Sequence, residues 1–187
     1  PLHTTRPPIT GGRCDSCQSL GCEKPRICTI IFKSSLPQVR MTITLEPIGM
    51  LHTPFTQPDS TPIQAVRSQA LGWIEIFEAF TPGLQDLQEF SHLILIYHLH
   101  RCTETHLLVE PFLDDKPHGI FATRHPFRPN HLGLSVVELV GCSGSRLDVR
   151  GVDMVDQSPL VDIKPFVPDF DLRQNARAGW YERRAKP

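Results

Sequence analysis

Prolines and glycines limit the length of any helix in this chain of 187 residues. Eighteen prolines and twelve glycines are spread between short apolar runs. Because proline cannot continue a helix interior and glycine favours turns, this spacing is typical of many short strands joined by turns. We therefore expect a mainly β fold with little helix. The length suits one core rather than two.

Seven short runs of β-favouring residues support this expectation, and each ends near Gly, Pro, Asp or Asn. They cover residues 48–51, 71–76, 91–99, 119–122, 134–140, 147–152 and 160–166. Seven short strands favour a compact, closed β-barrel, because closure removes the exposed edges of an open sheet; dimerisation is the other way to cover them. One or two helical turns are expected where Leu84, Leu87 and Phe90 recur at helical spacing.

Charge is distributed unevenly, although the net charge is only −1. Residues 1–44 carry six Lys/Arg against two Asp/Glu, a net +4, and residues 45–187 carry thirteen against eighteen, a net −5. We interpret residues 1–44 as a flexible, partly disordered basic arm and residues 45–187 as the barrel domain. No apolar run approaches the roughly 18 residues of a membrane span. Residues 1–12 lack the features of a secretory signal, so we expect a cytoplasmic protein.

The arm holds four of the six cysteines within fifteen residues: Cys14, Cys17, Cys22 and Cys28. Four thiolates at short spacing suit a structural zinc ion or an iron–sulfur cluster. A zinc ribbon has two Cys-x2-Cys pairs and only the first is present, so a flexible segment of reduced thiols is the alternative. With a zinc knuckle on the arm, a noncatalytic interaction module is another candidate function.

Histidines gather on one face of the strand predicted at 91–99. Side chains at i and i+2 of a strand lie roughly 7 Å apart, so His98 and His100 can chelate a metal if a third ligand comes from elsewhere. A metal-dependent β-barrel enzyme or metal sensor built on this pair is therefore the alternative function. The plainer interpretation is that these histidines meet carboxylates or a pocket ligand.

The segment containing Pro126 and Pro129 is rich in Arg, His and Asn between two apolar runs. The prolines restrict the backbone and lower the entropy cost of presenting Arg124, Arg128 and Asn130 to an anionic or planar ligand. We predict a binding loop. An ordered connection whose arginines pair with acidic residues of the core is the alternative.

Asp153, Asp156 and Asp162 flank a second polar segment, the turn at 157–159. Carboxylates there can accept from ribose hydroxyls or an ammonium group, can bind a cation, or can simply cap the backbone. The chain has no G-x-G-x-x-G, P-loop, H-E-x-x-H or G-x-S-x-G motif. Rossmann, P-loop, zincin and hydrolase-elbow sites are therefore excluded.

Five motifs follow one another along the barrel domain: Ile48-Gly-x-x-His52-x-Pro54, Pro62-x-Gln64, Gly83-Leu-x-Asp86-Leu-x-x-Phe90-Ser-His92, Phe121-Ala-Thr-Arg124-x-x-x-Arg128-Pro-Asn130-x-x-Gly133-x-Ser135 and Asp153-x-x-Asp156-x-x-Pro159-x-x-Asp162-Ile-Lys-Pro165. In these motifs the chain resembles the TrmO (TsaA-like) family of S-adenosylmethionine-dependent tRNA methyltransferases, from about Glu46 to Trp180. The resemblance implies a homodimeric β-barrel enzyme that binds S-adenosylmethionine outside a Rossmann fold. It also implies methylation of N6 of threonylcarbamoyl-adenosine next to the anticodon of tRNA.

The resemblance also implies which residues form the site. The cofactor would be surrounded by elements of two protomers, including Pro62, Gln64, His100, Arg101, Arg124, Leu132, Asp156, Gln157, Ser158 and Pro159. Arg124 could bind the methionine carboxylate bidentately. His125 or Asp156 would act as the catalytic proton acceptor for N6. Substrate contacts would fall to Arg128, Asn130 and Lys164.

Three residues depart from the family pattern near this expected site. His125 stands where Ser or Thr is typical, His131 stands where Pro commonly follows the Asn, and Gln157 stands where the turn has Gly. Gln157 restricts the φ angles open to the turn, and the two histidines add proton-transfer or phosphate-binding capacity. The identity of the substrate is the expectation that these departures affect most.

The net −5 of residues 45–187 opposes nonspecific RNA binding, because phosphate neutralisation dominates such affinity. We expect tRNA to bind to a local basic face that residues of the barrel domain form together with the arm. Its members are Arg101, Arg124, His125, Arg128, His131 and Lys164. Affinity for tRNA should then fall steeply with salt, and a flat response would count against RNA.

Overall fold

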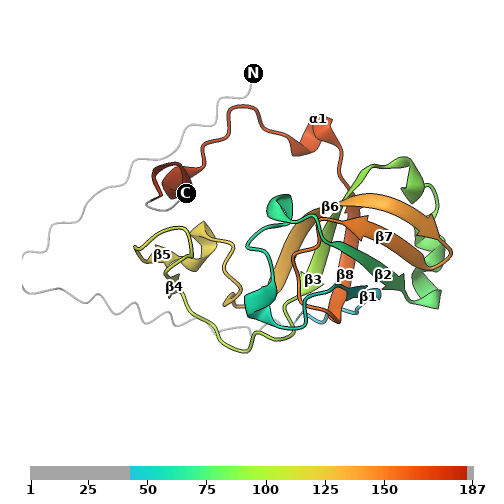
Figure 1. Cartoon of the computed structure of the whole chain (residues 1–187), viewed down its shortest axis with the longest axis horizontal. Helices are drawn as coiled ribbons and strands as arrows, with labels where there is room; N and C mark the ends of the chain where they lie inside the picture. The colour runs from blue at the N-terminus through green and yellow to red at the C-terminus, as the bar shows by residue number, and fades with distance from the viewer. Residues whose placement is uncertain (1–42, 185–187) are drawn as a thin grey trace, which may run out of the picture. The chain divides into compact units, whose positions relative to one another are not determined.

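Six antiparallel strands close into a barrel in the order β1-β2-β7-β6-β3-β8, and β8 pairs with β1 to complete the ring (Figure 1). In the computed structural model, which describes residues 43–184, the strands are β1 (Gly49–His52), β2 (Leu71–Ile76), β3 (His92–His98), β6 (Leu132–Ser143), β7 (Arg146–Arg150) and β8 (Ser158–Pro165). The predicted mainly β barrel with little helix is confirmed. The cysteine cluster at 14–28 lies outside the described residues, and the division at residue 44 stays a prediction.

The barrel interior is filled by the alternate side chains of its strands. Along β3, Leu93, Leu95 and Tyr97 are buried while the flanking His92 and His98 are exposed, as the period of two in this segment predicts. Fully buried side chains from the other strands meet them, among them Leu51, Ile74, Val137, Leu147 and Leu160. This alternation leaves the outward-facing positions free for polar contacts and for the loops.

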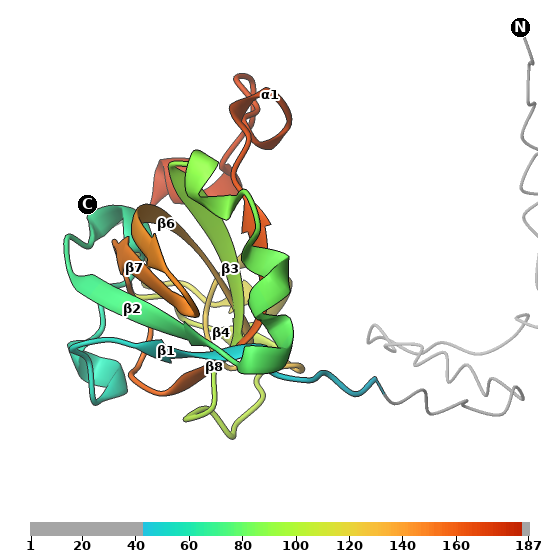
Figure 2. The same ribbon diagram turned by 90° about the vertical axis from the view of Figure 1, so that its right-hand side faces the viewer.

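The helical spacing at 84–90 appears as two short 3₁₀ helices, η3 (Glu78–Leu84) and η4 (Leu87–Glu89), which are green in Figure 2. Asp86 lies between them with φ 64°, a left-handed conformation that interrupts any continuous helix. Leu84 is nonetheless buried and Leu87 packs against the core. The predicted one or two helical turns are therefore present, as 3₁₀ helices, with the apolar side chains facing the core.

The predicted strand at 119–122 is wrong beyond its first residue. Strand β5 (His118–Gly119) pairs with β4 (Leu108–Val109) in a separate two-stranded ribbon. The 3₁₀ helix η5 (Ile120–Ala122) follows, because the Thr123 backbone N–H donates to the Ile120 carbonyl at 3.2 Å and the Thr123 hydroxyl donates to the same oxygen at 3.0 Å. These two bonds close a turn where the apolar composition alone favoured a strand.

Short helices complete the described part of the chain: η1 (Pro58–Ser60), η2 (Ala65–Arg67), α1 (Pro168–Asp171) and η6 (Gly179–Arg183). Neither these helices nor the others in residues 43–184 combine the length and apolar character that crossing a bilayer requires.

The topology brings three loops to the same end of the barrel. Strands β1, β7 and β3 end there and the antiparallel β2, β6 and β8 begin there. The loops at this end are 53–70, 99–131 and 151–157. They contain the whole of the 62–64 motif and parts of the motifs at 48–54, 121–135 and 153–165, so segments that are far apart in sequence meet at one place.

Candidate functional site

Gln64 and Arg124 meet across the gap between two of these loops. The Arg124 Nη1 donates to Gln64 Oε1 at 3.0 Å, although the two residues are 60 positions apart. Gln64 is the residue that precedes η2, and Arg124 follows the η5 turn that Thr123 closes. The structure thus brings together two of the residues predicted to surround a cofactor.

A cavity of about 350 Å³ lies beside this pair. It is lined by Gln64, Ala65, Val66, Ser68, Gln69, His92, Arg124, Leu134, Ser135, Val136, Glu138, Arg150, Gly151 and Asp153. Its apolar wall comes from the outward-facing side chains of β6, and its polar groups come from the loops and from strands β3, β6 and β7. The volume falls within the range of about 300–1,000 Å³ that is common for small-molecule sites.

Asp153 is the most perturbed acid in this cavity. Burial raises the pKa of its carboxyl group, while the hydroxyl of Ser135 and the charge of Arg124 act in the opposite direction. Ser135 Oγ donates to Asp153 Oδ1 at 2.5 Å. A carboxyl group that is held in a poorly solvated position against a cavity is a candidate for ligand binding.

A buried chain of hydroxyl groups supports Asp153 from inside the barrel. Tyr97 Oη lies 3.1 Å from Ser135 Oγ, and since the Ser135 proton is directed to Asp153, the Tyr97 hydroxyl donates to Ser135. Burial is the main cause that raises the pKa of Tyr97. Gly133 lies opposite Tyr97 in the β3–β6 ladder, and a Cβ at that position would lie 2.4 Å from the tyrosine ring.

The sequence indicates a binding role for Asp153 but does not predict the hydroxyl groups of Tyr97 and Ser135 that support it. Ser135 and Asp153 both stand in the motifs quoted above, which is a signal, but nothing in the sequence joined them. In the sequence, Tyr97 is simply one residue of the strand predicted at 91–99. The connection depends on the register that pairs Ser135 with Leu95, which places it diagonally across from Tyr97, and on the loop after β7 that brings Asp153 to Ser135.

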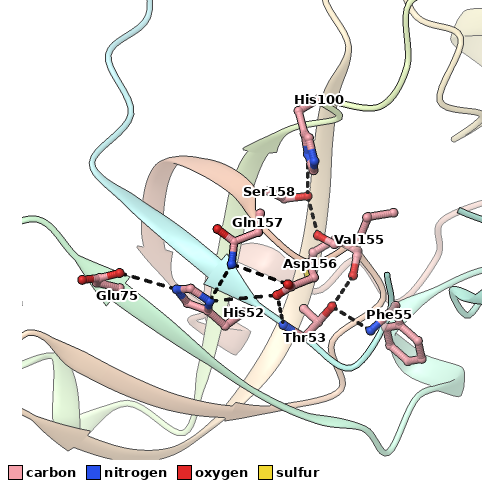
Figure 3. A network of polar contacts seen from close by, with 10 residues as sticks. His52, Thr53, Phe55, Glu75, His100, Val155, Asp156, Gln157 and Ser158 are labelled. Carbon is pink, nitrogen blue, oxygen red and sulfur yellow. Dashed lines mark hydrogen bonds and ion pairs between the residues drawn. The ribbon is translucent and has the colours of Figure 1, made fainter. Parts of the chain in front are cut away.

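The turn before β8 forms a second polar cluster, shown in Figure 3. Asp156 Oδ1 accepts the backbone N–H of Thr53 at 3.0 Å. Gln157 has φ 63°, the left-handed conformation for which glycine is better suited, and its Nε2 donates to His52 Nδ1 at 3.1 Å. The turn thereby joins the end of β1 to the start of β8.

Ser158 and His100 are joined in the same cluster. The Ser158 hydroxyl donates to the Val155 carbonyl at 2.7 Å, which leaves His100 Nδ1, 3.3 Å away, to donate to the hydroxyl oxygen (Figure 3). Burial lowers the pKa of His100, with smaller contributions from Arg101 and His98 and an opposing one from Asp156. The His100 ring is therefore held next to the predicted acidic turn.

A second cavity of about 350 Å³ opens beside this cluster, and His52, Trp73 and Asp156 are among its lining residues. The His52 ring stacks on Trp73 with 3.7 Å between centroids, and the Arg146 guanidinium lies 4.5 Å from the Trp73 ring centroid. His52 Nε2 lies 3.5 Å from Glu75 Oε2. The sequence indicates His52 only as a motif residue, and nothing in it predicts that His52 stacks on Trp73.

Two residues predicted to bind substrate have partners within the protein. Arg128 Nη1 donates to the carbonyl oxygens of Thr123 at 2.7 Å and Ile120 at 3.2 Å, so it braces the loop that carries Arg124. Lys164 on β8 forms an ion pair with Asp162 at 2.7 Å. Both side chains are thus occupied within the protein, although the partners of Arg128 are backbone carbonyls and not the acidic core residues of the alternative.

The other predicted residues lie around the same end of the barrel. Asn130 and Arg101 are exposed in the loop between β3 and β6, and Pro62 lies in the loop between β1 and β2. Leu132 begins β6 opposite His98, and Pro159 pairs with Met50. His125 is partly buried, and its Nδ1 accepts the Phe127 backbone N–H at 3.3 Å.

The histidine pair at 98 and 100 does not form a chelating face. Strand β3 ends at His98, whose ring lies edge-on to His131, and the His100 ring turns to Ser158. Within residues 43–184 there is no group of three His, Cys, Asp or Glu side chains that could hold a metal ion. The alternation was predicted to continue through residue 100, but the strand ends at His98. The side chains of His98 and His100 therefore do not share one strand face.

Comparisons with known proteins show which family this sequence belongs to. The family described as "tRNA-methyltransferase O N-terminal domain" matches residues 50–172. A probable S-adenosyl-L-methionine-binding protein of Pyrococcus abyssi is 51% identical over 144 residues, which are 76% of this chain and 78% of that protein. The tRNA (adenine(37)-N6)-methyltransferase of Mus musculus is 30% identical over 172 residues, which are 88% of this chain and 37% of the mouse protein.

Solved structures are also similar. TrmO from Pseudomonas aeruginosa superimposes with a TM-score of 0.64 at 34% sequence identity, over 74% of this chain and 62% of that one. The chain therefore spans most of the archaeal relative but less than two thirds of the mouse protein and of the Pseudomonas structure.

Proposed function

This chain belongs to the TrmO family, and on that premise we propose that it is an S-adenosylmethionine-dependent methyltransferase acting on N6 of threonylcarbamoyl-adenosine next to the anticodon of tRNA. The observation that supports this best is the meeting of Gln64 and Arg124 beside a cavity that Asp153 also lines. The names of the archaeal and mouse relatives support the cofactor and the tRNA substrate respectively.

The residues at this cavity fit S-adenosylmethionine in their chemistry. A guanidinium group suits its carboxylate, carboxylate and amide oxygens suit its ammonium group and ribose hydroxyls, and the outer face of β6 offers an apolar wall. We assign the methionine carboxylate to Arg124, whose orientation Gln64 holds through the bond at 3.0 Å. When bound, the cofactor supplies an electrophilic methyl group on a positively charged sulfur.

Catalysis of this transfer depends mainly on aligning the nucleophile with the methyl group, together with removal of a proton from N6. We propose Asp156 as the acceptor of that proton. Its Oδ1 is fixed by the Thr53 N–H, and the residue lines an open cavity. His125 fits the role less well, because its Nδ1 already accepts the Phe127 N–H, so the proton of the neutral ring lies on Nε2.

We also propose that the protein acts as a homodimer in the cytoplasm and binds tRNA. Large apolar side chains are exposed on the outer face of β6 and on η2 beside it: Leu134, Val136, Val140 and Val66. Such a face is a natural surface for a second copy. Arg101, Asn130 and the basic arm are the groups proposed to meet tRNA, with zinc or an iron–sulfur cluster on the arm as a further proposal.

The first experiment is a calorimetric titration of the full chain with S-adenosylmethionine. We expect wild-type protein to bind and Arg124→Ala to lose binding with little loss of stability, since Arg124 is exposed and, within residues 43–184, its side chain hydrogen-bonds to Gln64 alone. Arg177→Ala, at an exposed position of the C-terminal segment, is the matched control and should bind normally. A folded Arg124→Ala protein that binds normally would remove Arg124 from the site.

Activity is tested by mass spectrometry of nucleosides from tRNA incubated with the protein and cofactor. We expect one methyl group on threonylcarbamoyl-adenosine, and no product from tRNA that lacks the threonylcarbamoyl group. Methylation of unmodified tRNA instead would contradict the proposed substrate while leaving the methyltransferase activity in place.

A further inference from the structure

The cavity beside η2 contains opposite charges that are not paired with each other. Two of its charged side chains neutralise one another, because Arg150 Nη1 lies 2.8 Å from Glu138 Oε2. Arg124 has no carboxylate within 4.0 Å among the described residues, and its contact there is the neutral amide of Gln64. Asp153, whose field nevertheless reaches Arg124, has no cationic partner within that distance in residues 43–184 either.

Asp153 is held in this arrangement at an energetic cost. Burying a carboxylate without a counter-charge is unfavourable, and burial indeed raises the pKa of this group. The hydroxyl of Ser135, which occupies Oδ1, and the backbone hydrogen bonds from Ala65 and from Asp153 itself compensate only part of this cost. A cationic ligand group beside Asp153 would offset the remainder.

The support beneath Asp153 fixes the direction in which it points. Ser135 is 2% exposed and receives the hydroxyl of Tyr97, which is 5% exposed. Two buried donors in series thus hold one carboxylate oxygen from inside the barrel. Rigid hydrogen-bonded support of this kind is expected for a group that must meet a ligand in one geometry.

We infer that Arg124 and Asp153 together recognise an α-amino-acid group, with the carboxylate at Arg124 and the ammonium at Asp153. The inference rests on the proposed function and makes it more specific, because it assigns this cavity to the aminoacyl end of S-adenosylmethionine. Asp153 is then a cofactor-binding residue, and Tyr97 and Ser135 are positioning residues that act through it.

The test compares ligands that keep or lack the ammonium group and the whole amino-acid chain. The full chain is titrated by calorimetry with S-adenosylhomocysteine, with its analogue that lacks the amino group, and with 5′-methylthioadenosine, which lacks both charges. We expect wild-type protein to prefer S-adenosylhomocysteine over the deamino analogue by roughly tenfold or more, as the loss of a charge-assisted hydrogen bond predicts.

Asp153→Asn keeps the shape of the side chain and an oxygen for Ser135 but removes the charge. We expect this variant to lose roughly tenfold affinity for S-adenosylhomocysteine and none for the deamino analogue, so the preference disappears. Asp148→Asn is the matched control, because Asp148 is a carboxylate of β7 that pairs with Arg146 outside this cavity. It should leave all three affinities unchanged.

The outcomes separate this inference from the proposed function. Absence of any cofactor binding by wild-type protein would overturn both. Wild-type protein that binds S-adenosylhomocysteine and the deamino analogue equally would overturn only the role of Asp153, and this comparison needs no variant. An Asp153→Asn protein that weakens both ligands equally would show a structural role for the carboxylate, and would likewise reject the inference.

Discussion

Gly133 and Tyr97 face each other across the β3–β6 ladder, and the ring lies where a side chain on residue 133 would stand. We predict that Gly133→Ala lowers the free energy of unfolding by about 1–3 kcal/mol, because overpacking displaces Tyr97 and its bond to Ser135. Urea denaturation measures the change. Gly83→Ala is the control, since a Cβ at Gly83 would meet no atom within 4 Å, and it should unfold like the wild type. Equal midpoints for both variants would contradict the close approach.

His125 makes stability depend on pH in a defined direction. Burial lowers its pKa, with a smaller contribution from His106, so between this lowered value and the ordinary value near 6.5 the unfolded chain binds the proton more readily than the folded one. The contribution of His125 to the free energy of unfolding is therefore complete above a pH of about 6.5 and is lost as the pH falls towards the folded-state pKa. His100 acts in the same direction.

We predict that His125→Gln reduces the loss of stability between pH 7.5 and pH 5.5 compared with wild-type protein. Denaturation midpoints measured across this pH range give the two slopes. His92→Gln, which replaces an exposed ring on β3, should keep the wild-type slope. A His125→Gln protein with an unchanged slope would show that other groups control the acid sensitivity.

At the scale of elements, the C-terminal helix η6 is attached to the loop that carries Arg124. Trp180 Nε1 donates to the Ala122 carbonyl at 2.7 Å, and the Trp180 ring stacks on His118 at 4.4 Å between centroids. His118 Nε2 in turn lies 3.0 Å from Asp114 Oδ2. These contacts join residues beyond the matched family domain to the turn just before Arg124.

We predict that Trp180→Ala accelerates hydrogen exchange at residues 118–124 and 179–183 without changing exchange in the barrel strands. Affinity for S-adenosylmethionine should fall several-fold, because the Arg124 loop loses an anchor. Phe170→Ala, at an exposed aromatic residue of α1, should change neither measurement. Unchanged exchange at 118–124 would show that the loop holds its conformation alone.

The barrel strands were predictable because half of each is buried and the alternation is visible in the sequence, as in 91–99. The register was not, since it depends on irregularities between Ile96 and Tyr97 in the β3–β8 ladder and between Leu139 and Gly141 in the β6–β7 ladder. The turn at 120–122 was mistaken for a strand because the bonds that close it involve Thr123, outside the apolar run.

In the candidate site, too, some residues could be predicted from the sequence and others could not. Gln64, Arg124 and the 156–159 turn could be predicted from motifs, each of which is local in sequence. The chain from Tyr97 through Ser135 to Asp153 could not, because its members become neighbours only once β3 and β6 are in register. The contacts of Arg128 with two loop carbonyls were likewise invisible, since they depend on the folded shape of the loop itself.

At the scale of the whole molecule, charge is divided between the arm and the barrel domain. Residues 1–44 carry +4 and residues 45–187 carry −5. We predict that full-length protein binds tRNA more tightly, and with a steeper dependence on salt, than a chain beginning at Ile43, because fewer counterions are released without the arm. Filter binding over a range of salt concentrations gives both slopes.

A charge control keeps the arm in place. The double variant Lys24→Gln, Arg26→Gln should depend on salt less steeply than the full chain and more steeply than the chain beginning at Ile43. Identical slopes for the full and shortened chains would place the RNA contacts on the barrel domain alone.

The pairing of β1 with β8, which sets Gly49 opposite Leu160, closes the barrel and allows its strands to be connected in another order. A ring of six strands has no first member, so the covalent order of the strands is separable from the barrel that they form. The turn at Gly144 lies at the end of the barrel opposite the three loops. A circular permutant opened there, with a linker from the segment after β8 to the segment before β1, would keep every strand pairing and leave the three loops intact.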